Sequence, residues 1–127
     1  MKNFSKRLAF DFDGVINSYI SGWTGIDHLV DPPISGIKEL FESLKIKGYE
    51  IYIFSSRCTE EKGIIAITEY LIKYNIPFDA VIEGKPDKCW LIIDDRCICF
   101  KGKPHIKTLL QEIEDFKPYD YNINKKG

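Results

Sequence analysis

Short apolar runs alternate along the chain with longer stretches in which apolar residues recur at helical spacing. The short runs are continuous rather than alternating, which is typical of strands buried on both faces of a parallel sheet. Four such runs predict strands: 8–12, 51–54, 80–82 and 90–93. Three longer stretches predict helices: 37–44, 59–75 and 105–116.

The residues at the ends of these stretches support the helix boundaries. Gly48 is a natural end for the first helix. Thr59 can cap the second helix, and Glu60 is well placed in its positive first turn. After the third helix, a polar tail of about residues 120–127 is expected to fray.

The order of strands and helices predicts an α/β fold. We expect a three-layer α/β/α architecture, in which helices cover both faces of a doubly wound, mostly parallel sheet. The length of 127 residues suits one domain, 1–127, with neither linker nor repeat. Ligands of such folds bind at the carboxyl ends of the strands.

Composition and charge narrow the classes of function. The 18 Lys and Arg residues against 19 Asp and Glu residues leave a net charge of -1, which argues against a nucleic-acid surface without excluding a local patch. Since no apolar run approaches the ~18 residues of a membrane span, we expect a cytoplasmic protein. The four cysteines include no C-x-x-C pair, so zinc and disulfides are not expected, and the thiols should pack as small apolar groups.

Polar side chains follow three of the predicted strands. They are Asp11 and Asp13, then Ser55 and Ser56, then Asp94 and Asp95, and Lys85 precedes the fourth strand. Carboxylates gathered in one crevice repel each other unless a cation joins them, and oxygen ligands suit Mg²⁺. With a hydroxyl and an amine nearby, such a site can bind a phosphoryl group.

These residues resemble four motifs of the haloacid dehalogenase superfamily of phosphohydrolases. The motifs occur in the family's order between Leu8 and Arg96: Asp11-Phe12-Asp13-Gly14-Val15, then Ser55, then Lys85-Pro86, then Ile92-Ile93-Asp94-Asp95. The chain is similar to small bacterial and phage members of the superfamily. The resemblance implies a Mg²⁺-dependent phosphatase with a Rossmann-like fold.

The resemblance also implies a role for each motif residue. Asp11 attacks phosphorus and forms an aspartyl-phosphate, while Asp13 protonates the leaving oxygen and then activates water. Ser55 and Lys85 hold the phosphoryl group. Mg²⁺ is bound by Asp11, by the backbone carbonyl of Asp13 and by Asp94, with Asp95 as a further ligand or as the partner of one.

Three positions leave alternatives open. Lys88 can supply the amine instead of Lys85, because the stretch before Asp94 is short for the family. Ser56 can replace the preceding serine if the strand ends one residue later. Arg57 and Arg96 can each bind a substrate anion through a bidentate contact, or form a surface salt bridge.

The spacing between motifs indicates an uncapped member of the family. Residues 16–31 have room only for a flap, in which Trp23 and His28 are candidates for substrate contact, and 78–84 leave no room for a cap. We expect the substrate to be a small phosphorylated metabolite or nucleotide, with a neighbouring copy in a homo-oligomer able to cover the site. An open site can also accept a macromolecular end, on a polynucleotide or a phosphoprotein.

Two rival functions fit the same fold. A receiver-like signalling domain also gathers acidic residues around Mg²⁺, but its phosphoacceptor ends the third strand, and here that strand is followed by Glu83-Gly84. A catalytically weak binding module would keep the fold for the sake of a partner. The binding module does not explain why every catalytic position is filled.

Overall fold

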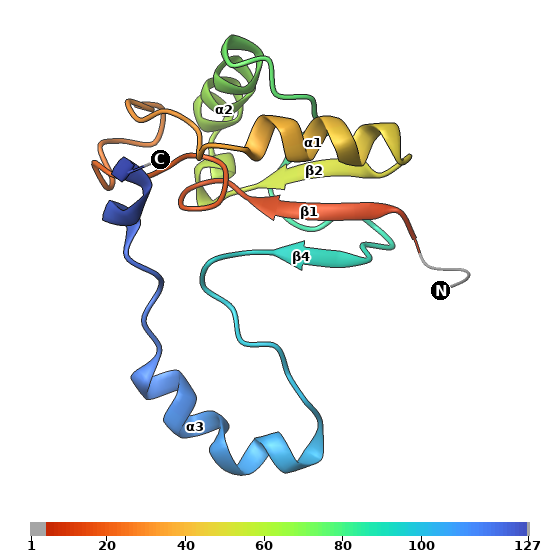
Figure 1. Ribbon diagram of the computed structural model, residues 1–127, viewed down its shortest axis with the longest axis vertical. Helices are drawn as coiled ribbons and strands as arrows, with labels where there is room; N and C mark the ends of the chain where they lie inside the picture. The colour runs from red at the N-terminus through yellow and green to blue at the C-terminus, as the bar shows by residue number, and fades with distance from the viewer. Residues whose placement is uncertain (1–4, 127) are drawn as a thin grey trace.

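The computed structural model describes residues 5–126 and has an α/β fold with a four-stranded, all-parallel sheet (Figure 1). The sheet has the strand order β3-β2-β1-β4. Its elements follow one another as β1 (Arg7–Asp11), α1 (Ile37–Ile46), β2 (Glu50–Phe54), η1 (Ser56–Thr59), α2 (Glu61–Lys73), β3 (Ala80–Ile82), β4 (Leu91–Ile93), η2 (Lys103–His105), α3 (Ile106–Asp115) and η3 (Tyr121–Lys126). All four predicted strands and all three predicted helices are present.

The main core lies between the sheet and the helices α1 and α2. Phe10 of β1 packs against Phe41 of α1, with ring centroids 4.6 Å apart. In the register of the sheet, Phe10 is paired with Ile53 of β2 and with Ile93 of β4. Ile67 of α2 joins the same buried cluster. The continuous apolar runs therefore face these two helices with every second residue.

The predicted third layer does not form. In Figure 1, α3 lies apart from the sheet, and none of its ten residues, all of them described, is buried. On the face opposite α1 and α2, Ala9 is buried, but its register partner Ile92 is 44% exposed. The physical reason is the course of the chain after Ile93, which leaves the sheet without a regular element until Lys103 and does not return α3 to that face.

Two smaller predictions are wrong. Thr59 does not cap α2, because the Ser55 hydroxyl first caps η1 by accepting from the Arg57 N–H, and Glu60 then precedes α2. The C-terminal tail is not frayed up to Lys126: η3 is helical, and Asn124 donates to the Ser18 carbonyl at 2.8 Å. Residue 127 lies outside the described part.

The cysteines follow the prediction only in part. Cys58 is buried in the core, as expected, whereas Cys97 and Cys99 are exposed. Within residues 5–126, none of the helices has the length and apolar character that a membrane crossing requires.

Candidate functional site

A pocket of about 300 Å³ lies at the carboxyl ends of β1, β2 and β4, the edge where parallel α/β sheets bind ligands. Its lining consists of Asp11, Asp13, Tyr19, Phe54, Ser55, Ser56, Asp94, Asp95, Arg96 and Tyr121. Seven of the nine predicted site residues are among them; Arg57 and Lys85 are not. The predicted convergence of Asp11, Ser55 and Asp94 at one sheet edge is therefore confirmed.

Three carboxylates form a compact acidic cluster in this pocket. Asp11, Asp94 and Asp95 each offer an oxygen within 4.8 Å of the others. Burial, a hydrogen bond with Asp95 and the charge of Asp94 together raise the pKa of Asp11 to about 8. Without a cation, the proton that Asp11 retains reduces the repulsion among the three carboxylates. Because all three donors are oxygens, the cluster can hold a hard divalent metal ion such as Mg²⁺ in place of that proton.

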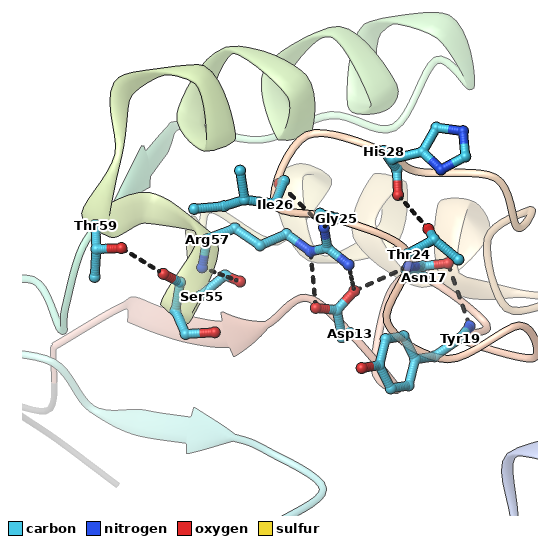
Figure 2. A network of polar contacts seen from close by, with 11 residues as sticks. Asp13, Asn17, Tyr19, Thr24, Gly25, Ile26, His28, Ser55, Arg57 and Thr59 are labelled. Carbon is cyan, nitrogen blue, oxygen red and sulfur yellow. Dashed lines mark hydrogen bonds and ion pairs between the residues drawn. The ribbon is translucent and has the colours of Figure 1, made fainter.

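The Asp13 carboxylate lies in a network of hydrogen-bond donors (Figure 2). Arg57 donates from Nε to Oδ2 at 2.9 Å and from Nη2 to Oδ1 at 3.2 Å. Asn17 donates from Nδ2 to Oδ1 at 2.9 Å. The two motif aspartates consequently differ in their surroundings: Asp11 lies among carboxylates, and Asp13 lies beside a guanidinium.

Arg57 is not a surface residue, so the surface salt bridge that the sequence allowed is wrong, and its side chain does not line the pocket. Its side chain is 1% exposed, and Nη1 donates to the backbone carbonyls of Gly25 and Ile26 in the flap. The guanidinium carbon lies 4.4 Å from the centroid of the Trp23 ring. Arg57 therefore joins the flap to the loop that carries Asp13 and fixes the orientation of Asp13 (Figure 2).

The serine pair after β2 divides into two roles. Ser55 is buried and lines the pocket, and its Oγ accepts a hydrogen bond from the Arg57 N–H at 3.1 Å. Because Oγ is an acceptor in that bond, its own hydrogen is available to a ligand. Ser56 is exposed, and its carbonyl accepts from Thr59. The geometry favours Ser55 as the ligand-binding hydroxyl.

The C-terminal segment closes one side of the pocket, which sequence reasoning missed. The Tyr121 hydroxyl donates to Asp95, and the Tyr119 hydroxyl donates to the Gly14 carbonyl at 2.6 Å. A Cβ at Gly14, which has φ +82°, would lie 2.6 Å from atoms of both Asp95 and Tyr121. Glycine is therefore required here both by its backbone angle and by the close approach of the tail.

The positive charge in the pocket comes from Arg96, one of the two arginines predicted to bind a substrate anion. Among the described residues that line it, Arg96 is the one cation. A hydrogen bond with the Tyr121 side chain raises the pKa of Arg96. Lys85 and Lys88, both described, are exposed in the loop before β4 and do not line the pocket.

The flap contributes a different aromatic residue from the expected one. Tyr19 lines the pocket and has a positive φ of 57°, and its ring meets that of Tyr121 edge-on at 5.4 Å. Trp23 covers Arg57 instead, and His28 is an exposed residue whose carbonyl accepts from Thr24.

Sequence signals for the missed residues are weak. Asn17 stands four residues after Asp13, a spacing that hints at contact within the loop, but nothing local marks Tyr121.

Comparison of the chain with protein-family models, with curated proteins and with solved structures gave no match.

Proposed function

We propose that this chain is a Mg²⁺-dependent phosphomonoester hydrolase of the haloacid dehalogenase type, with Asp11 as the nucleophile. The observation that carries the proposal is the convergence of Asp11, Asp94 and Asp95, with carboxylate oxygens within 4.8 Å of one another, in a pocket that Asp13 and Ser55 also line. A cation on the cluster would let three carboxylates admit an anionic phosphate ester.

The two aspartates divide the reaction between them. A carboxylate oxygen of Asp11 forms a bond to phosphorus as the ester P–O bond breaks. Asp13, whose carboxylate first takes up a proton from solvent, gives that proton to the leaving oxygen. A water molecule then attacks the aspartyl-phosphate. Asp13 takes up a proton from this water, and inorganic phosphate and free Asp11 are the products. The three hydrogen bonds from Arg57 and Asn17 hold Asp13 in one orientation for both steps.

The remaining polar groups bind the phosphoryl oxygens. Ser55 can donate its hydroxyl hydrogen, and Arg96 supplies positive charge at the rim. Mg²⁺, when bound by the acidic cluster, would neutralise the charge that develops on the transferred group. Lys85 joins the site only if the loop before β4 moves toward the pocket.

The pocket favours a small substrate. Its volume of about 300 Å³ lies at the lower end of ligand pockets. Tyr19 and Tyr121 form an aromatic wall beside Arg96, which suits a phosphorylated metabolite or a mononucleotide. Since Tyr19 is the one residue of 16–31 that lines the pocket, the flap does not form a lid of its own.

Phosphatase assays test this proposal directly. The purified chain should hydrolyse an aryl phosphate and at least one member of a panel of phosphorylated metabolites and nucleotides in the presence of Mg²⁺. A chelator should abolish this activity, and excess Mg²⁺ should restore it. Hydrolysis that persists undiminished in the chelator, or that survives in Asp11→Asn, would contradict the proposal.

A further inference from the structure

Exposed apolar side chains are concentrated in one part of the chain. Of the sixteen large apolar side chains that are exposed among the described residues, eight lie from β4 to the residue after α3. Leu91 shares the face of its register partner Leu8, on the side of α1 and α2, and the other seven are Ile92, Ile98, Phe100, Ile106, Leu110, Ile113 and Phe116. Single exposed apolar residues are ordinary, but a gathering of this kind marks an interaction surface.

One half of this surface is a stripe along α3. Ile106, Leu110 and Ile113 recur at the spacing of one helix face, and Leu110 is 69% exposed. Phe116 continues the stripe and, with Ile98 and other residues, borders an apolar groove of about 550 Å³. A helix with such a stripe is stable in water only when the stripe is packed against another element.

The other half is the uncovered face of the sheet. Ala9 of β1 is paired with Tyr52 of β2 and with Ile92 of β4, so these three side chains share a face. Phe10, one residue on, points to the opposite face and meets α1. Ala9 is the one buried residue among the described strand residues that share its face. A parallel sheet normally has helices on both faces, so a helix is missing here.

Contacts at both ends of α3 order the segments that connect this helix to the rest of the chain. On one side of α3, the Lys101 N–H donates to His105 Nδ1 at 3.0 Å, and the Phe100 ring stacks on His105. On the other side, only residues 116–118 separate α3 from Tyr119, which is hydrogen-bonded to Gly14. Figure 1 shows α3 projecting from the sheet between these two ends.

We propose that a second copy of this chain supplies the missing helix: two chains associate about a twofold axis, and α3 of each packs on the uncovered sheet face of the other. Each chain carries both complementary surfaces, so a twofold pair covers all of them and closes. The pair contains two identical helix-on-sheet contacts. Together they can reach the ~1,200–2,000 Å² that stable interfaces bury.

Charge does not oppose the same partner. The loop that leads into β4 carries both signs, because the exposed Lys85 and Lys88 alternate with the exposed Glu83 and Asp87, and α3 also carries both signs. Neither surface therefore presents a single sign of charge that would repel the other. Arg96 lines both the site pocket and the apolar groove beside α3, so a partner packed against α3 would lie near the pocket. The proposal does not depend on phosphatase activity.

The oligomeric state tests the proposal. By light scattering after gel filtration at about 100 µM chain, where a micromolar association is largely complete, the protein should have twice the 14.7 kDa mass of one chain. The double variant Leu110→Glu, Ile113→Glu should halve that mass. Neither residue is buried, so thermal unfolding should show that each variant chain is folded. Ile46→Glu, at an 87% exposed position of α1, is the matched control and should remain a dimer.

Cross-linking identifies which helix covers which sheet. In a background with Cys89, Cys97 and Cys99 replaced by serine, chains carrying Ile92→Cys are mixed with differently tagged chains carrying Leu110→Cys. Oxidation should join one tag to the other. A monomeric wild-type protein would overturn the proposal, as would a dimer that survives the double variant. A third sample consists of chains that carry both Ile92→Cys and Leu110→Cys. A disulfide that forms within these chains, while none joins the two tags in the mixture, would also overturn the proposal, since α3 would then cover its own sheet.

Discussion

Arg57 and Asp13 stand 44 residues apart in the sequence and form a buried, two-pronged ion pair. The Arg57 side chain is 1% exposed, and the Asp13 side chain is 17% exposed. In such surroundings the attraction is strong, but removal of one partner leaves the other charge without compensation. Arg57 lies in η1 and also contacts the flap, so the pair links both segments to the orientation of Asp13.

Replacing Arg57 should destabilise the fold as well as the site. Arg57→Met should lower the free energy of unfolding by about 3–5 kcal/mol, because it leaves Asp13 unpaired. Arg7→Met is the control, since Arg7 forms a partly exposed pair with Glu50 at 3.4 Å, and pairs of that kind contribute only about 0–1 kcal/mol. Urea denaturation compares the two. Equal losses for both variants would show that the Arg57 pair is no more important than a surface contact.

Gly63 should not tolerate even a methyl group. A Cβ at Gly63 would lie 1.9 Å from the Arg57 carbonyl oxygen, a backbone atom that cannot move aside cheaply. Gly63→Ala should therefore destabilise the protein by about 1–3 kcal/mol through overpacking, even though alanine is the better helix former by about 1 kcal/mol. Gly84→Ala is the control, because nothing lies within 4 Å of its Cβ position. A Gly63→Ala variant with a raised melting temperature would contradict the close packing of α2 on η1.

The acidic cluster should make the metal-free protein less stable as the pH rises. The folded state keeps the Asp11 proton up to a pKa of about 8, whereas the unfolded chain releases it near the ordinary value of 3.8. Between these values the folded state binds the extra proton, so stability is lost as the pH increases. Melting temperatures in a chelator should fall from pH 5.5 to pH 8, and Mg²⁺ should raise them more at pH 8.

Asp11→Asn provides the control for this pH dependence. The amide carries no charge, so the variant should lose most of the slope and should be more stable than the wild type at pH 8 without metal. An unchanged slope in Asp11→Asn would show that another group is responsible.

The parts of the fold and site that could be predicted are those that depend on local sequence. The run Leu8-Ala9-Phe10 is apolar at every position, so its strand is recognisable, and Asp11 then falls at the strand end. Asp94 likewise comes directly after a short apolar run, the strand β4. Because parallel strands end at one edge, the acidic cluster could be expected without any knowledge of long-range contacts.

The parts that could not be predicted depend on contacts between distant residues. Nothing near Arg57 in the sequence reveals that Asp13 lies beside it, and the polar tail gives no sign that Tyr121 binds Asp95. The amphipathic pattern of α3 predicts a packed helix, but it does not say which surface packs on it. Local pattern alone therefore led to a three-layer fold that the structure does not have.

The source of the phosphate-binding charge can be decided by kinetics. Arg96→Ala should raise KM by about 10–100-fold, the equivalent of a lost charge-assisted hydrogen bond of about 1.5–3 kcal/mol, because Arg96 lines the pocket. Lys85→Ala and Lys88→Ala should change KM by less than Arg96→Ala does. If Lys85→Ala instead abolishes turnover, the loop before β4 must close over the bound substrate.

Asp11 and Asp13 have identical side chains, so any difference between their variants must come from placement. Asp11→Asn should abolish turnover, because an amide is a poor nucleophile and the acidic cluster loses a charge. Asp13→Asn should leave Mg²⁺ binding intact but slow an alkyl phosphate by roughly 10²–10⁴-fold, since the leaving oxygen then lacks its proton donor. The variant should also be less stable, because Arg57 loses its charged partner, so rates are compared at a temperature at which it is folded. An aryl phosphate, whose leaving group needs no proton, should be slowed less. Single-turnover rates for both substrates measure the difference; near wild-type turnover in Asp11→Asn, or equal losses on both substrates in Asp13→Asn, would show that the roles are assigned wrongly.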